Sequence, residues 1–252
     1  MTAEPVEVSV DPPLAVVRFD DGPGRNRLAE RPRAALVGAV RRAGADQRVH
    51  AVVLAGRADV FCAGAPASRM LAGHEERVVA MVELVRAVVD CPVPVVAAAR
   101  GHALGGGLLL ALYADIAVLS ERSRYATSFT RFGFTPTLGA TYLVPAVLGR
   151  ALGTEMLYTG RGYSGRELAA RGAGVQVTRH DEVEPAALRA ARLVAGAPRR
   201  TVELLKAELA GPVRRAAAAA FERELPAHEL TIGAAVARAR IRELAGAEGD
   251  PA

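Results

Sequence analysis

The sequence predicts an α/β protein with a helical C-terminal region, and three observations support this fold class. Short apolar runs at 50–56 and 92–101 end in glycine, as buried strands often do. Valines recur at helical spacing over 78–89. After about residue 180 the pattern is helical throughout. We therefore expect an α/β core over 1–180 and a C-terminal helical region over 181–252.

The elements of the core follow in order from the N-terminus. Two strand-like runs in "VEVSVDPPLAVVRFDD" are separated by Asp-Pro-Pro, and the loop "DGPGRNRL" follows them. A helix fits 31–44, because its apolar residues fall on one face. A buried strand at 50–56, a second helix over 78–89 and a buried strand at 92–101 come next. A glycine turn at 105–107, a short apolar helix and the strand "DIAVLS" complete the alternation.

Composition narrows the class of protein. The chain has 252 residues, 51% of them hydrophobic, and a net charge of +5 at pH 7. Its arginines are spread along helical segments with few aromatic residues between them, which disfavours nucleic-acid binding. The longest apolar stretch is interrupted by Arg100 and His102, so no membrane span is expected, and the N-terminus does not resemble a signal peptide. We expect a cytoplasmic protein with reduced, buried thiols at Cys62 and Cys91.

The triple glycine Gly105–Gly107 lies where a buried strand ends and a helix begins. Such a turn presents unpaired N–H groups at the positive end of a helix, which favours negative charge. A phosphate loop is disfavoured, because no lysine, serine or threonine follows the glycines. An oxyanion hole is the other interpretation, with a second amide from the loop "FCAGA" at 61–65. A turn needed only for packing is the alternative.

The stretch "GHALGGGLLLALYADIAVLS", together with "AVVLAGRADVFCAGA" upstream, resembles the crotonase (enoyl-CoA hydratase/isomerase) superfamily. The resemblance covers most of the chain. It implies a ββα superhelix core and a C-terminal helical region that takes part in trimerisation. It further implies a thioester substrate whose carbonyl becomes an enolate, held by the backbone amides of Ala65 and Gly106.

Hydratases of this superfamily carry two glutamates that activate water and deliver a proton. The corresponding positions here are Leu109 and Phe129, and both are apolar. Water addition through a carboxylate pair is therefore disfavoured. Decarboxylation needs no strong base, because the departing CO2 leaves its electron pair behind. An apolar wall would also disfavour a substrate carboxylate relative to neutral CO2.

The segments "YATSFTRFGFTPTLGAT", "LYTGRGYSGRELAARG" and "ERELPAHELT" resemble decarboxylating crotonase homologues of polyketide β-branching cassettes. That resemblance implies conversion of a 3-methylglutaconyl group on an acyl carrier protein to 3-methylcrotonyl. His228 occupies the place of a histidine implicated in catalysis. A lysine of those homologues is missing here, and Arg77, or less favourably His74, is the nearest cation. Arginine does not readily release a proton, which favours His228 as the donor.

Five residues are candidates for the wall of the acyl pocket: Leu109, Phe129, Phe132, Phe134 and Tyr142. Core packing is an equal alternative for the phenylalanines and the better one for Tyr142, which falls in an apolar helix. His102 is expected to be a structural hydrogen-bonding residue, and Asp115 to accept from nearby backbone amides. No group of residues has metal-ligand spacing, so no metal is expected.

The resemblance also implies the partners. No cofactor is expected beyond the phosphopantetheine of a carrier protein, or coenzyme A, that carries the substrate. Scattered arginines would attract an acidic acyl carrier protein of a polyketide synthase. A homotrimer or a dimer of trimers is the expected assembly. Two alternatives stay open: an enoyl thioester hydratase, dehydratase or isomerase with His228 as its base, and a non-catalytic binder of an acyl carrier protein.

Overall fold

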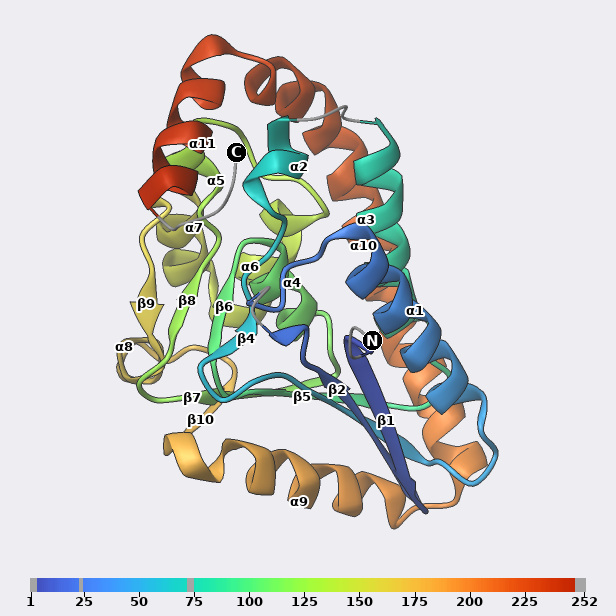
Figure 1. Ribbon diagram of the computed structural model, residues 1–252. Helices are drawn as coiled ribbons and strands as arrows, with labels where there is room; N and C mark the ends of the chain where they lie inside the picture. Colours follow the sequence, from blue (N-terminus) through green and yellow to red (C-terminus); the bar gives the residue numbers. More distant parts are fainter. Residues whose placement is uncertain (1–3, 23–24, 72–74, 248–252) are drawn as a thin grey trace.

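The larger of two sheets has six strands in a computed structural model that describes residues 4–22, 25–71 and 75–247. Their spatial order is β1 (Val6–Asp11), β2 (Leu14–Phe19), β3 (Ala51–Ala55), β5 (Val95–Ala99), β7 (Ile116–Ser120) and β10 (Gln176–Thr178). β1 and β2 pair antiparallel, and all later neighbours pair parallel. The strands predicted in the N-terminal stretch, at 50–56 and at 92–101 are confirmed (Figure 1).

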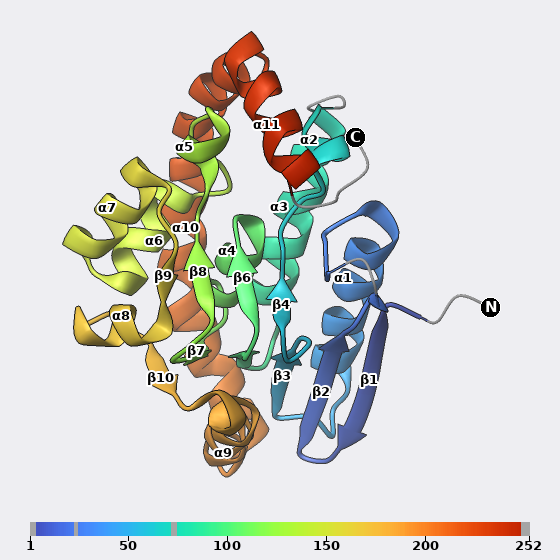
Figure 2. The same cartoon turned by 60° about the vertical axis from the view of Figure 1, so that its left-hand side comes forward.

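The smaller sheet consists of β4 (Val60–Cys62), β6 (His102–Leu104), β8 (Arg124–Ala126) and β9 (Tyr163–Ser164), which lie side by side in Figure 2. β3 leads into β4, β5 into β6 and β7 into β8, and a helix follows each pair. Those helices are α2 (Ala67–Leu71) with α3 (Glu75–Val89), α4 (Gly106–Leu112) and α5 (Phe129–Phe132). This repeat of strand, strand and helix confirms the ββα core.

The central strands of the larger sheet are buried on both faces, as is usual for parallel strands. On one face, Val53 packs with Ala187 of α9 (Val183–Ala195). On the other face, Val52 and Leu54 belong to the main hydrophobic core. Figure 1 shows α9 on the opposite side of this sheet from the rest of the helices that cover it. The strand side chains alternate between the two faces, so one apolar run contributes both to the packing against α9 and to the main core.

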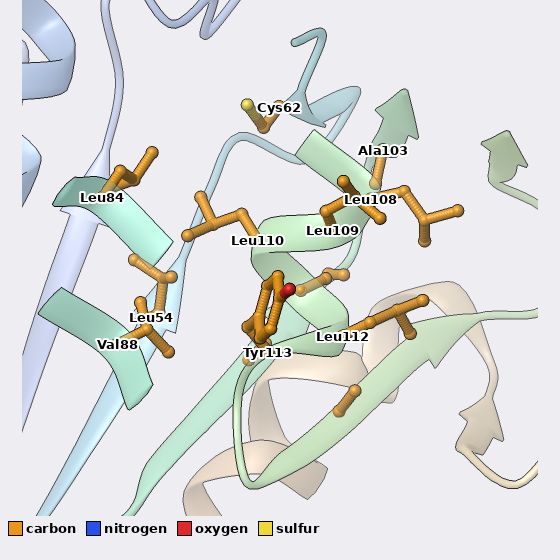
Figure 3. Close-up of a cluster of buried hydrophobic side chains, with 14 of the residues drawn as sticks. Leu54, Cys62, Leu84, Val88, Ala103, Leu108, Leu109, Leu110, Leu112 and Tyr113 are labelled. Atoms are coloured by element: carbon orange, nitrogen blue, oxygen red, sulfur yellow. The ribbon is translucent and has the colours of Figure 1, made fainter. Parts of the chain in front are cut away.

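Helix α4 lies inside the main core. Its residues from Gly107 to Leu112 are all buried, and Figure 3 shows its leucines spreading toward several neighbouring elements, including Leu84 and Val88 of α3. A helix that is apolar all round has no solvent face, which explains the unbroken aliphatic run in the sequence. The core therefore fixes the position of the N-terminus of α4, where the glycine turn lies.

The C-terminal region is helical, as predicted. α10 (Arg199–Ile232) runs alongside the core and packs on α6 (Ala140–Leu148), and α11 (Ala235–Ala247) follows it. Lys206 of α10, 4% exposed, holds both carboxylate oxygens of Asp115 at 2.7 and 2.6 Å. The remaining elements are α1 (Glu30–Ala45), α7 (Arg150–Thr159), α8 (Gly165–Ala170) and the 3-10 helix His180–Glu182.

Several predictions about single residues are confirmed. His102 Nδ1 accepts the Arg124 amide at 2.8 Å, and Asp115 accepts the Val95 amide at 2.8 Å. Cys62 and Cys91 are buried free thiols. None of the helices in the described ranges is long and apolar enough to cross a membrane. The cytoplasmic location and the division of the chain at residue 180 stay predictions.

Candidate functional site

The glycine turn and the loop after β4 border a cavity of about 110 Å³. That volume is on the scale of one small organic molecule. Its walls come from segments far apart in the chain, which the fold brings together. They are formed by Arg27, Ala63, Gly64, Ala65, Met70, Met81, Leu104, Gly105, Gly106, Thr127, Ser128, Phe129, Phe132, Phe134, Thr137, Leu138, His228 and Ile232. The cavity thus brings together six of the predicted site residues: the two amide donors, the three phenylalanines and His228.

The turn before α4 depends on glycine for two reasons. Gly105 has φ +53°, a backbone conformation that residues other than glycine rarely adopt. A Cβ on Gly107 would lie only 2.1 Å from the carbonyl oxygen of Cys62. This close approach brings the end of β4 directly against the first turn of α4. The two loops that carry the predicted amide donors are therefore in contact.

The loop that carries Ala65 is anchored from a distant part of the chain. Its neighbour Gly64 pairs with Arg27 in a parallel bridge, and the Gly64 carbonyl accepts the Leu28 amide at 2.8 Å. A Cβ on Gly64 would lie 3.4 Å from the Gly106 nitrogen. In the described part of the chain, no acceptor is hydrogen-bonded to the amide of Ala65 or of Gly106.

Asn26, which the sequence analysis did not single out, holds the segment before Arg27. The residue is fully buried, and its side-chain amide donates to the carbonyls of Phe19, at 2.7 Å, and Phe61, at 3.1 Å. Its side-chain oxygen accepts the Asp21 amide at 3.0 Å. Asn26 thereby ties β2 and β4 together next to the cavity. The sequence signal was weak: one asparagine in a loop rich in glycine and arginine.

His228 lies on α10 and is 3% exposed. Its Nδ1 is 2.7 Å from the Thr135 carbonyl oxygen, and because a carbonyl can only accept, Nδ1 carries the hydrogen. The neutral ring then has its lone pair on Nε2. The ring packs edge-on against Phe134, with centroids 5.3 Å apart. The imidazole is therefore fixed in position and in tautomer at the wall of the cavity.

Three aromatic rings form one side of the cavity. Phe134 packs against Phe129 and Phe132, each with a centroid distance of 6.0 Å. All three rings line the cavity, and their role as the wall of an acyl pocket stays a prediction. No carboxylate lines the cavity in the described residues. Burial raises the pKa of the Cys62 thiol to about 12, so this nearby cysteine is protonated at neutral pH.

Two predicted pocket residues lie elsewhere. Leu109 is fully buried in the main core and does not line the cavity, because the middle of α4 is surrounded by other elements. Tyr142 on α6 is half-buried and packs against the same core. His74 lies outside the described residues. Arg77 lies on α3, and its side chain is also outside the described part of the structure.

Most of the other wall residues were missed by the sequence analysis, and four of them show what they contribute. Met70 and Met81 supply flexible apolar surface, and Arg27 and Thr137 supply polar groups. Thr137 falls in the segment "YATSFTRFGFTPTLGAT" that carries the family resemblance, but the resemblance assigned no role to it, and the other three belong to no motif that points to the cavity. They line the same cavity only because the tertiary structure brings together four segments that are distant in sequence.

A family model described as enoyl-CoA hydratase/isomerase matches residues 11–242. The chain is 32% identical to the bacillaene synthase decarboxylase PksI of Bacillus subtilis, over 98% of this chain and 100% of that one. The ECH2 decarboxylase domain of CurF from Lyngbya majuscula superposes with a TM-score of 0.88, at 30% identity over 96% of this chain and 100% of that one.

A third structure comes from a dehydratase/decarboxylase enzyme couple involved in polyketide β-branching. It gives a TM-score of 0.88 at 31% identity, over 95% of this chain and 96% of that one. The fold and the glycine-turn cavity thus define a protein of the crotonase class. The chain belongs to the enoyl-CoA hydratase/isomerase family, as the sequence predicts.

Proposed function

We propose that this protein is a carbon–carbon lyase that decarboxylates a 3-methylglutaconyl-type thioester on an acyl carrier protein during polyketide β-branching. One observation carries the proposal. Two unpaired backbone amides, those of Ala65 and Gly106, border a cavity whose described walls contain no carboxylate. Such a site can stabilise an enolate but lacks the acid and base pair that water addition uses. The decarboxylases among its relatives support the same reaction.

The reaction breaks the bond between the carboxylate carbon and C4 of the acyl group. The electron pair of that bond moves through the conjugated double bond to the thioester oxygen, and CO2 leaves. The amides of Ala65 and Gly106 hold the oxyanion, each lowering the barrier by about 2.7–4 kcal/mol. A proton added at C4 then gives the 3-methylcrotonyl thioester. The phenylalanine wall keeps water from the carboxylate and favours neutral CO2.

His228 delivers the proton in this proposal. It borders the cavity, and its Nδ1–H donates to Thr135, so Nε2 is the nitrogen that takes up and releases a proton. Arg77 and His74 stay secondary candidates, with a role in holding the substrate carboxylate. The substrate arrives on phosphopantetheine, and no other cofactor takes part.

The experiment that tests this function is intact-mass analysis of a carrier protein loaded with the 3-methylglutaconyl group. Loss of one CO2 supports decarboxylation, whereas gain or loss of one water supports a hydratase or dehydratase. Gly106→Pro is the matching variant, because proline is compatible with the first position of a helix but has no N–H. If this variant still binds the loaded carrier protein while the parent shows no turnover, the protein is a non-catalytic binder.

His228→Ala tests the proton donor. We expect CO2 release or product formation to fall by about 10²- to 10⁴-fold, as is typical when a general acid is lost. His50→Ala is the control, because His50 contacts the carbonyl of Ala195, the last residue of α9, and does not line the cavity. Turnover of His228→Ala within twofold of the parent would assign the proton to another group, and Arg77→Ala would be the next variant.

The assembly is a homotrimer or a dimer of trimers in this proposal, with α10 in the interface. Large apolar side chains on α10 support it, because four of them are more than half exposed in the single chain: Leu204, Leu205, Leu209 and Leu230. Exposed apolar clusters of this kind mark interaction surfaces.

A further inference from the structure

One polar group in the wall of the cavity has no partner. Thr137 is 8% exposed, and its hydroxyl oxygen is buried without a hydrogen bond. In the described residues only one other buried side-chain atom, Nε of Arg100, shares this state. Buried polar groups are almost always hydrogen-bonded, and an exception costs free energy. A valine of nearly the same shape would avoid that cost, so packing alone does not account for a threonine here.

Nearby buried hydroxyl groups differ from Thr137. The Thr127 hydroxyl donates to the Met156 carbonyl at 3.3 Å, although Thr127 also lines the cavity. The hydroxyl of the half-buried Thr135 also has a partner, because it lies 3.3 Å from the Thr231 hydroxyl. Among the buried hydroxyl groups of this wall, the unsatisfied state is therefore specific to Thr137.

The segment around Thr137 is held rigidly from behind. Leu138 has φ +62°, a left-handed conformation that is unusual for a bulky residue. Its carbonyl accepts the Tyr113 hydroxyl at 2.6 Å, and the next amide, of Gly139, donates to the buried carboxylate of Glu224 at 2.7 Å. Backbone strain that surrounding contacts maintain is typical of functional sites. The backbone of Thr137 is thus fixed, and rotation about its Cα–Cβ bond is the motion left to its hydroxyl.

The geometry points to Thr137 as a substrate-binding residue that donates one hydrogen bond to the carboxylate of the acyl group. This inference rests on the proposed function, because the proposed substrate has two groups that need a donor. The thioester oxygen is assigned to Ala65 and Gly106. The distal carboxylate remains, and Thr137 lines the same cavity, three residues after Phe134 in the chain. The backbone of Arg27, in contrast, pairs with Gly64 beside the amide donors.

A single hydroxyl donor suits this reaction. It orients the carboxylate so that the C–C bond to be broken can align with the conjugated system. It also leaves the carboxylate with far fewer donors than it has in water, so the preference for neutral CO2 is retained.

The test compares binding of two pantetheine thioesters, glutaryl and butyryl, by calorimetry. The glutaryl chain carries a distal carboxylate but is saturated, so loss of CO2 would leave an unstabilised carbanion and the ligand survives the measurement. Thr137→Val should lower the preference for glutaryl over butyryl roughly tenfold, as expected for a hydrogen bond to a charged group. Thr137→Ser, which keeps the hydroxyl, should retain the preference within twofold.

An unchanged preference in Thr137→Val would overturn the inference. The melting temperature of the ligand-free Val variant gives a second readout, and we expect it to equal or exceed that of the parent. A lower value would show that the hydroxyl has a structural partner and would contradict the inference. Failure of the proposed function is distinguishable, because it appears as no CO2 loss by the parent, whereas the binding preference requires no turnover.

Discussion

At the scale of single residues, the site depends on places where two backbone segments approach too closely for a side chain. Gly107 is the clearest case, because its Cβ would lie 2.1 Å from the Cys62 carbonyl oxygen. A backbone atom cannot move aside as a flexible side chain can. The contact between β4 and α4, and with it the relative position of the two amide donors, therefore requires glycine at this position.

Gly107→Ala is expected to lower the free energy of unfolding by about 1–3 kcal/mol, the usual cost of overpacking. Activity should fall with it, because the two loops must separate. Gly211→Ala is the matched control: it lies inside α10, its nearest neighbour would be 3.6 Å away, and alanine in a helix gains about 0.5–1 kcal/mol. Urea denaturation of both variants gives the comparison. Equal stability of Gly107→Ala and the parent would contradict this expectation and would show that β4 can move away from the added methyl group at no cost.

At the scale of elements, β6 and β8 are joined next to the glycine turn by a side chain that titrates. His102 Nδ1 accepts the Arg124 amide, which requires that nitrogen to be unprotonated. Burial, and then the positive charge of Arg124, lowers the pKa of His102. Above about pH 6.5 the imidazole is neutral in both folded and unfolded chains, so this contact is fully present. Below that pH the unfolded chain takes up the proton first, and stability falls.

We therefore expect the free energy of unfolding to decrease as the pH falls from 7 to 5. His102→Asn should reduce this slope, because the asparagine side-chain oxygen can accept the same amide and does not titrate. The pKa of His180 is lowered as well, by burial, so part of the slope should remain. Denaturant titrations at several pH values measure how the free energy of unfolding depends on pH. A variant slope equal to that of the parent would exclude His102 as a source.

At the scale of the whole molecule, an ion pair joins the helical tail to the core, with its lysine buried and its aspartate partly exposed. Lys206 holds Asp115, and Asp115 also accepts the Val95 amide, so α10, the start of β7 and β5 meet at one carboxylate. Removing one partner of a buried pair leaves an uncompensated charge and costs about 3–5 kcal/mol, and the partial exposure of Asp115 places the expected cost at the lower end of that range. This pair is a prominent contact between the two halves of the chain.

Lys206→Met should destabilise the protein by about that amount, measured by urea denaturation. The double variant with Asp115→Asn should be less destabilised than the sum of the single variants, because the two groups interact. Arg214→Met is the control, since Arg214 and Asp90 form an exposed pair at 2.6 Å, where loss costs about 1 kcal/mol or less. Additive effects of the two core substitutions would contradict the coupling.

The proposed assembly is tested at the same scale. Leu205→Glu, on the exposed face of α10, should convert the trimer to a monomer in light-scattering measurements. Leu193→Glu, on α9, places the same charge at a residue that is 83% exposed and should leave the molar mass unchanged. The opposite result would place the interface on α9 and not on α10.

How far the sequence predicted the molecule depended on how regular each pattern was. Five strands of the larger sheet and the helices α1 and α3 were predictable, because strand and helix periods are visible over five or more residues, whereas β10 of the same sheet has three residues and was not predicted. The smaller sheet was not, since β4, β6 and β8 have three residues each, too few to show a period. Leu109 was assigned to the cavity wall from its position relative to the glycine turn. That position does not determine the direction of the side chain on a fully buried helix, and Leu109 does not line the cavity.

The glycine turn and His228 were predictable from motifs, whereas Asn26 and Thr137 were not. Asn26 acts through hydrogen bonds to segments distant in sequence, and Thr137 is distinguished by the hydrogen bond that its hydroxyl lacks. Neither property produces a local sequence pattern. The hydrogen bond from His228 to Thr135 spans 93 positions and depends on how α10 crosses the core.

The ion pair of Lys206 has a practical consequence, because this residue is the only lysine in the chain. In the folded protein its amine is 4% exposed and engaged by a carboxylate, so amine-directed reagents should modify it only when α10 detaches. Acetylation at this one site, followed over time, would then report the opening rate of the helical tail without any engineered probe.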